Sequence, residues 1–249
     1  PAVYNTGDAA GDTYGGNLAN LQGSAYNDTL IGNASANALD GGAGDDTLEG
    51  LGGADVFRGG AGIDTVSYAH SNAGVVVDLS NGGVIVMTND AAGDFFFGVE
   101  NITGSSFNDS LYGDVNNNVL IGGTGNDLLD GGGGLDTASY AGASGAVTIN
   151  LATNTVTGAA GSDTLVSIER IIGSGYADSI TGSSGDDWID GGSGSVSTAD
   201  TISGGSGTDT ISFDSSGGPV TVVLNSSSSD GRILSSFENI YGSVYGDTL

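Results

Sequence analysis

Residues 23–67 read GSAYNDTLI GNASANALD GGAGDDTLE GLGGADVFR GGAGIDTVS, which is five consecutive nine-residue units that each begin with glycine. The sixth place of every unit is Asp or Asn, and the eighth place is Leu, Phe or Val. An unbroken register of this kind predicts a repeat architecture, in which each unit is a small element that stacks on its neighbours.

The same nonapeptide returns further along the 249-residue chain. Residues 104–139 read GSSFNDSLY GDVNNNVLI GGTGNDLLD GGGGLDTAS, residues 173–212 read GSGYADSIT GSSGDDWID GGSGSVSTADTIS GGSGTDTIS, and residues 242–249 begin a fourth run with GSVYGDTL. The sixth-place residues that open the runs are 81, 69 and 69 residues apart: Asp28, Asp109, Asp178 and Asp247. The chain therefore consists of similar modules of one array.

Connecting segments separate the repeat blocks. The phrases Val99-Glu100-Asn101-Ile102, Ile168-Glu169-Arg170-Ile171 and Phe237-Glu238-Asn239-Ile240 each lead into a glycine and a serine. Alternating stretches at 75–79, 146–151 and 220–224 predict strands with a period of two. We therefore divide the chain into a connector fragment at 1–22, repeat blocks at 23–67, 104–139, 173–212 and 242–249, and connector strands at 68–103, 140–172 and 213–241.

The nonapeptide itself predicts a turn followed by a short strand. Six glycine-rich residues can adopt the left-handed backbone states of a tight turn, which residues with a Cβ atom adopt only at a cost. In the three residues that follow, the eighth-place side chain points to one face and its neighbours point to the other. Because one unit buries only one good apolar side chain, it cannot fold alone. Two units are expected to form one coil of about eighteen residues, with a turn on each edge of a thin core.

Composition narrows the chemistry of these turns. The chain has 30 acidic and 3 basic residues, a net charge of −27, one histidine and no cysteine. This charge excludes nucleic acid and anionic membrane surfaces as partners. The longest apolar runs are far shorter than the ~20 residues that a spanning helix needs, so we expect no direct membrane insertion. Residue 1 is Pro, and we expect the sequence to be a segment of a longer exported protein.

Stacked turns would bring sixth-place carboxylates together along each edge, where they would repel one another. A hard divalent cation with six to eight oxygen ligands removes that repulsion, and exposed turn carbonyls supply the ligands that the carboxylates do not. Ca²⁺ fits better than Mg²⁺, which demands near-ideal octahedral geometry and keeps its waters.

The units resemble the glycine- and aspartate-rich nonapeptide of the RTX (repeats-in-toxin, haemolysin-type) calcium-binding family. Residues 41–48, 122–129 and 204–211 match its defining places without a substitution. The resemblance implies a parallel β-roll with calcium between stacked turns, secretion from a bacterium and folding outside the cell. We accordingly predict an all-β fold, a right-handed parallel β-roll solenoid.

The resemblance also implies the calcium ligands. The side-chain ligands would be Asp28, Asn37, Asp46, Asp55, Asp64, Asp109, Asn118, Asp127, Asp136, Asp178, Asp187, Asp200 and Asp209. Backbone carbonyl ligands would come from Gly41, Gly42, Gly44, Gly59, Gly60, Gly62, Gly122, Gly123, Gly125, Gly131, Gly132, Gly134, Gly204, Gly205 and Gly207.

These ligands define about seven sites between turns. They pair Asp28 with Asp46, Asp46 with Asp64, Asn37 with Asp55, Asp109 with Asp127, Asn118 with Asp136, Asp178 with Asp200, and Asp187 with Asp209. About seven ions would add roughly fourteen positive charges to a chain of net charge −27, which would roughly halve the mutual repulsion. We expect weaker sites at Asn37 and Asn118, an altered one at the enlarged turn before Asp200, and an empty turn at Asp247.

Other residues have simpler interpretations. The aspartates could be ordinary turn residues, but their single repeat position favours calcium. The ninth-place residues Asp40, Asp130 and Asp190 are expected to face solvent. His70 stands beside Ser67 and Ser71 without a nucleophile-elbow motif, so we expect no hydrolase and no enzyme. Residues 95–97, a Phe triplet, could form a contact patch; we expect instead a connector strand with two core rings.

The sequence thus predicts a calcium-binding structural region of a secreted bacterial surface protein, an S-layer, fibre or adhesin, whose partners are calcium and copies of itself or other surface proteins. The alternative is the calcium-dependent secretion and folding region of a larger exported enzyme or toxin. In both cases, like charges would keep the chain extended in a low-calcium cytosol and extracellular calcium would fold it.

Overall fold

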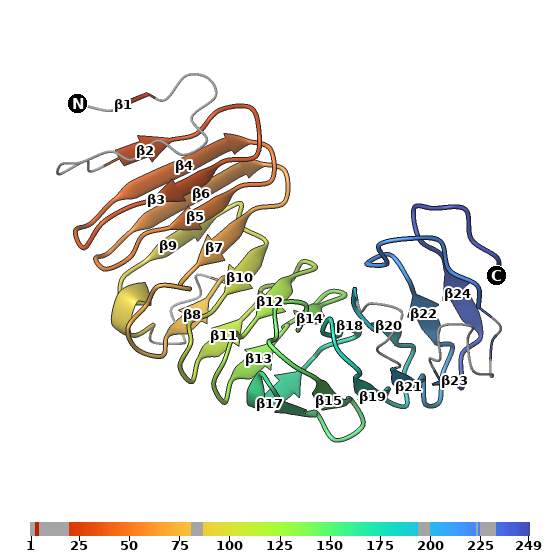
Figure 1. Cartoon of the computed structure of the whole chain (residues 1–249). Coiled ribbons are helices and arrows are strands. Elements are labelled where there is room, and N and C mark those ends of the chain that lie inside the picture. The colour runs from red at the N-terminus through yellow and green to blue at the C-terminus, as the bar shows by residue number, and fades with distance from the viewer. Residues whose placement is uncertain (1–2, 5–19, 81–86, 194–199, 223, 225–232) are drawn as a thin grey trace.

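A computed structural model describes residues 3–4, 20–80, 87–193, 200–222, 224 and 233–249. Most of the predicted connector fragment at 1–22 and part of the enlarged turn before Asp200 lie outside these residues. The described residues form short strands stacked along an elongated, curved solenoid, with β2 to β6 near one end and β21 to β24 at the other (Figure 1). The predicted all-β parallel fold is confirmed.

One sheet runs along the whole solenoid. Its ten strands are, in spatial order, β24 (Asn239–Tyr241), β22 (Thr210–Ser212), β20 (Trp188–Asp190), β18 (Arg170–Ile172), β14 (Thr137–Ser139), β12 (Val119–Ile121), β10 (Asn101–Thr103), β7 (Thr65–Ser67), β5 (Thr47–Glu49) and β3 (Thr29–Ile31). Because this sheet takes one strand from nearly every coil, it joins all the modules into one body.

Two further sheets form the opposite face. The first contains β1 (Val3–Tyr4), β2 (Asn20–Gln22), β4 (Ala38–Ala43), β6 (Val56–Ala61) and β9 (Phe95–Phe97). The second contains β23 (Ile233–Ser235), β21 (Thr201–Ser203), β19 (Ser179–Thr181), β15 (Val147–Asn150), β16 (Thr155–Gly158), β17 (Gly161–Val166), β13 (Leu128–Asp130), β11 (Ser110–Tyr112) and β8 (Val76–Asp78).

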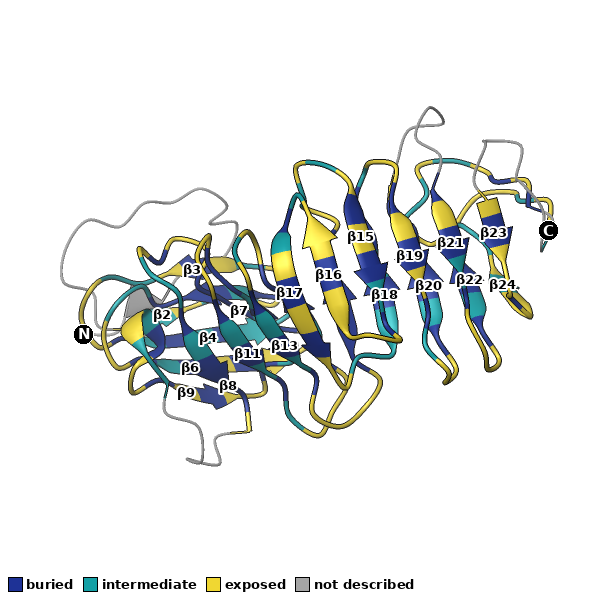
Figure 2. Ribbon diagram, turned by 90° about the horizontal axis from the view of Figure 1, so that it is seen from below, coloured by how far each residue is buried: buried dark blue, intermediate teal, exposed yellow. Residues whose placement is uncertain are grey.

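The register of the strands confirms the predicted coil. Thr29 pairs with Thr47 and Leu30 with Leu48 in parallel strands, and the bonds that join stacked turns within the first two blocks span 18 residues. In the third block they span 22, because one turn is four residues longer. Every eighth-place residue of the three full blocks is buried: Leu30, Leu39, Leu48, Phe57, Val66, Leu111, Leu120, Leu129, Ala138, Ile180, Ile189, Ile202 and Ile211. Buried and exposed residues alternate along the strands (Figure 2). Each coil thus contributes about two buried side chains, each worth roughly 1.5–3 kcal/mol.

The connectors reverse the order of the coils locally. In the first connector, β8 pairs with β11 of the next block, whereas the later strand β9 pairs with β6 of the previous block. In the second, β15 pairs forward with β19, β17 pairs back with β13, and β16 lies antiparallel between them. The sequence predicted the strands at 75–79 and 146–151 but not β16. At 220–224 the described residues show only a bridge between Thr221 and Thr248.

The prediction that the Phe triplet buries two rings is wrong. Phe96 is buried and stacks on Phe57 with 5.6 Å between ring centroids, but Phe95 and Phe97 are 56% and 54% exposed. Because Phe96 pairs with the eighth-place Phe57, its two neighbours must point to the outer face of the strand. Arg58 covers one of them, with its Cζ 5.7 Å from the centroid of the Phe97 ring.

The only helical element among the described residues is η1 (Asn89–Ala91). It is a single short turn, and no helix in this part of the chain is long and apolar enough to span a bilayer.

Candidate metal-binding turns

Glycine at the second and fourth places gives several of the turns their backbone shape. Gly42 and Gly44 have φ values of 106° and 114°, in the region that side chains other than hydrogen disfavour. The stacked turn repeats this conformation at Gly60 and Gly62, with φ of 119° and 139°. Turns with glycine at both places therefore share a left-handed backbone shape as they stack.

Glycine at the first place leaves room for oxygen atoms. A Cβ atom on Gly41 would overlap Oδ2 of Asp46 and would lie 2.7 Å from the carbonyl oxygen of Gly59 in the next turn. The carbonyls of Gly41, Gly122, Gly131 and Gly204 lie in the same way against the first glycine of the preceding turn, at Gly23, Gly104, Gly113 and Gly182. A carboxylate and a carbonyl thus converge on one small space between stacked turns.

The sixth-place side chains form two hydrogen-bonded ladders, one on each edge. The amide of Asp28 donates to Oδ1 of Asp46, and the amide of Asp46 donates to Oδ1 of Asp64, both at 2.8 Å. The same bond joins Asn37 to Asp55, Asp109 to Asp127, Asn118 to Asp136, Asp178 to Asp200 and Asp187 to Asp209. The structure therefore brings together all seven predicted pairs.

The second carboxylate oxygen distinguishes the turns. Among the described residues it is buried without a hydrogen-bond partner in a set of repeat aspartates: Asp46, Asp55, Asp64, Asp127, Asp136 and Asp209. A buried, unpaired carboxylate oxygen costs several kcal/mol unless a cation or a donor reaches it. Calcium fits this space, because it accepts carboxylate and carbonyl ligands at irregular geometry. The buried carboxylate oxygens and the turn carbonyls would be its ligands, and the first-place glycine leaves room for it. No three His, Cys, Asp or Glu side chains cluster into a metal site in this part of the chain.

Serine at the second place changes this arrangement. In the turn that opens the second block, the hydroxyl and amide of Ser105 donate to the carboxylate of Asp109, at 2.8 and 2.6 Å. The same serine contacts occur at Asp28, Asp178, Asp187 and Asp247. Donors therefore reach both oxygens of Asp109, Asp178, Asp187 and Asp247, whereas the two Ser24 bonds to Asp28 both reach Oδ2. The sequence analysis treated Asp28, Asp109, Asp178 and Asp187 like the other ligands, although Ser in place of Gly was a readable signal.

The asparagine turns also differ, as expected. Oδ1 of Asn37 accepts the amide of Asn33 at 2.7 Å, and Oδ1 of Asn118 accepts the amide of Asp114 at 2.8 Å. Neither asparagine carries a charge, so each site rests on one carboxylate. The expectation that these two sites are weaker stays a prediction.

Sequence analysis missed the residues that continue the ladders into the connectors. The amides of Asp64, Asp136 and Asp209 donate to Oε2 of Glu100, Glu169 and Glu238, and those of Asp55 and Asp127 donate to Oδ1 of Asp94 and Asp163. The sequence contained a signal for this role, because Glu100 precedes Ile102 by the same two residues that separate the sixth and eighth places.

The prediction that the ninth-place residue Asp190 faces solvent is wrong. Asp190 is buried and accepts hydrogen bonds from Gly192 and Ser215.

One ladder end is closed by a tyrosine. The hydroxyl of Tyr68 donates to Oδ2 of Asp94 at 2.7 Å, inside the core. Burial raises the pKa of Asp94 to about 7, although the Asp55 amide and the Tyr68 hydroxyl hold it lower than burial alone would. Asp94 thus has donors for both oxygens without a metal ion.

Burial also raises the pKa of the repeat carboxylates. The pKa of Asp127 rises to about 7 because of burial, with the charge of Asp163 acting in the same direction. Burial raises the pKa of Asp136 to about 6, and Glu169 adds to the shift. For Asp46 and Asp64 the pKa is raised by burial as well. Without a cation, the fold therefore favours protonated carboxyl groups.

These shifts predict how the calcium-free protein responds to pH. The folded pKa values of about 6 to 7 lie above the ordinary value of 3.8, so the protons they hold stabilise the fold fully below pH 3.8, and this stability is lost as pH rises through 6 to 7. We expect metal-free protein to gain strand signal in far-UV circular dichroism when pH is lowered from 8 to 5. An unchanged signal, or one that grows with rising pH, would contradict the shifts.

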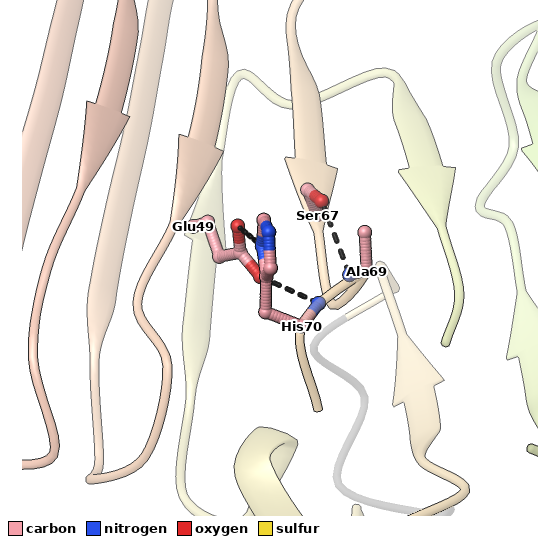
Figure 3. A network of polar contacts seen from close by, with 4 residues as sticks. All are labelled: Glu49, Ser67, Ala69 and His70. Atoms are coloured by element: carbon pink, nitrogen blue, oxygen red, sulfur yellow. Dashed lines mark hydrogen bonds and ion pairs between the residues drawn. The ribbon is translucent and has the colours of Figure 1, made fainter. Parts of the chain in front are cut away.

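The histidine predicted to be non-catalytic is bound to a glutamate. Glu49 of β5 accepts the His70 amide at 3.0 Å and contacts its Nδ1 at 2.8 Å (Figure 3). Neither flanking serine bonds the ring, because Ser67 accepts the amide of Ala69 and Ser71 donates to the carbonyl of Ala73.

The RTX calcium-binding nonapeptide repeat model matches residues 14–48, 32–66, 103–138, 167–195 and 197–215, together more than half of the chain. A comparison with curated proteins gives no significant match. The matched residues contain the stacked turns with buried, unpartnered carboxylate oxygens described above. The chain therefore belongs to the RTX family and is a calcium-binding repeat region.

Proposed function

We propose that this region is a structural part of a secreted bacterial surface protein, an S-layer, fibre or adhesin, that folds when it meets extracellular calcium. It would hold about seven ions in the predicted inter-turn sites and would have no catalytic role of its own. The observation that carries this proposal is the set of buried carboxylate oxygens between stacked turns, which lack a partner until a cation is supplied.

The continuity of the long sheet supports a structural role. It includes strands from β3 to β24 and therefore passes through the three full repeat blocks and the three connectors between residues 68 and 241. A body in which each coil contacts only its neighbours extends without a limit of size and presents long lateral surfaces. Such a shape suits assembly at a cell surface, with copies of itself or other surface proteins as partners.

Localisation tests the proposal. Cells that produce the full-length protein are labelled with gold-conjugated antibody against this region and viewed by electron microscopy, with and without a calcium chelator in the medium. We expect label on the outer surface in millimolar calcium and its release by the chelator. Recovery of the protein only as a soluble exported enzyme or toxin, with unlabelled cells, would support the alternative role and reject this one.

A further inference from the structure

Three of the four glutamates of the chain occupy equivalent places in the structure. Glu100, Glu169 and Glu238 each take the place of a sixth-place aspartate in the ladder that leads into the long sheet. Their Oε2 atoms accept the amides of the preceding ladder residues at 2.8, 3.0 and 2.9 Å. The described residues make no hydrogen bond with the other oxygen of these carboxylates.

The backbone before each glutamate also imitates a full turn. Gly98, Ser167 and Ser236 have left-handed φ values of 57°, 49° and 56°. Their carbonyl oxygens lie where a Cβ atom on the first glycine of the preceding turn would stand, at Gly59, Gly131 and Gly204. A full turn places its own first-glycine carbonyl in this position. Three pairs of connector residues thus reproduce both the carbonyl and the carboxylate of a turn.

The preceding turn presents an oxygen that needs a partner. Asp64, Asp136 and Asp209 are 0%, 0% and 1% exposed, and each has a buried Oδ2 without a hydrogen-bond partner. The two arginines in the described part of the chain lie against aromatic rings instead: Cζ of Arg58 is 5.7 Å from the centroid of the Phe97 ring, and Cζ of Arg170 is 4.6 Å from that of Trp188. On the other edge, by contrast, Tyr68 donates to the second oxygen of Asp94. At the glutamate ends of the ladders, the buried Oδ2 of the aspartate therefore still lacks a partner, whereas at the other end both oxygens of Asp94 accept hydrogen bonds.

We propose that Glu100, Glu169 and Glu238 each close one additional calcium site, formed with the aspartate of the preceding turn and the carbonyl of Gly98, Ser167 or Ser236. This inference rests on the calcium-dependent folding proposed above and adds three sites to those predicted from the nonapeptides. Each site binds the last turn of a block to the connector that follows it, so calcium couples the folding of successive modules.

Glutamine substitutions separate a ligand from an amide acceptor. Glu100→Gln, Glu169→Gln and Glu238→Gln keep an oxygen for the aspartate amide but remove the charge that an ion requires. In native mass spectrometry of the whole chain at saturating calcium, we expect each single variant to bind one ion fewer than the wild type and the triple variant to bind three fewer. Glu49→Gln is the matched control: Glu49 is buried against His70, and its substitution should leave the ion count unchanged.

The outcomes are distinct. A triple variant that folds in calcium and binds as many ions as the wild type would show that the glutamates only accept hydrogen bonds, and would overturn the inference while leaving calcium-dependent folding intact. A wild type that binds no calcium would overturn both. If the triple variant does not fold, a crystal structure of the calcium-loaded wild type decides, because electron density for an ion between Asp64 and Glu100 is expected and its absence rejects the sites.

Discussion

Replacing Gly60 by alanine is expected to destabilise the calcium-loaded protein severely. The residue has φ of 119°, and a Cβ atom there would overlap the carbonyl oxygen of Gly42 in the stacked turn. The strained backbone costs about 1–3 kcal/mol, and the steric overlap costs about 1–3 kcal/mol more. Because whole domains are stable by only about 5–15 kcal/mol, one such substitution removes a large part of the total. Urea denaturation in saturating calcium measures the loss.

Gly142 provides the matched control. No atom lies within 4 Å of a Cβ placed on Gly142, and its φ is not positive. Alanine there should leave the free energy of unfolding unchanged or raise it by up to about 1 kcal/mol, since it restricts only the unfolded chain. Equal stability of Gly60→Ala and Gly142→Ala would contradict the close contact between stacked turns.

Withdrawal of calcium is expected to have the largest effect of all, namely loss of the fold. A ligand whose free concentration is ten times its dissociation constant stabilises the folded state by about 1.4 kcal/mol per site. About seven such sites would contribute roughly 10 kcal/mol, as much as the entire stability of an ordinary domain. The same sites contribute almost nothing when calcium is at a hundredth of that constant. At neutral pH the buried carboxylates and the net charge of −27 then oppose folding.

Magnesium should not replace calcium in this role. The turns provide carboxylate and carbonyl oxygens at irregular positions, whereas Mg²⁺ requires near-octahedral geometry and retains several waters. Equal concentrations of the two ions therefore discriminate between specific sites and general screening of charge.

The repeat register explains why much of the fold was predictable. A strict nine-residue spacing places Leu48 over Leu30 and Asp46 over Asp28, and parallel stacking follows from that repetition. The ladder pairs could be predicted for the same reason. The connectors lack this periodicity. The return of β9 to β6 depends on pairing between residues far apart in sequence. The antiparallel strand β16 forms hairpins with its neighbours, but the turns at 151–154 and 159–160 contain no Asn-Gly or Asp-Gly pair that would have indicated them.

Within the site, the difference between turns with serine and turns with glycine at the second place was harder to predict from the sequence. Whether Oδ2 of an aspartate has a partner depends on the residue four places earlier, as the bonds from the amide and hydroxyl of Ser105 to Oδ2 of Asp109 show. The roles of Glu100 and Asp94 were hidden because both follow connector segments of irregular length. Only the spacing of Glu100 from Ile102 suggested that it stands in a turn.

The most direct test of calcium-dependent folding is a calcium titration of the whole chain at pH 8, followed by far-UV circular dichroism and by hydrodynamic radius. We expect an expanded chain without strand signal in excess chelator, and a cooperative gain of strand signal with contraction as calcium approaches about 10⁻⁴ to 10⁻³ M, the range of extracellular calcium modules. Magnesium at the same concentration should not produce it. A compact chain with full strand signal in excess chelator would contradict the account.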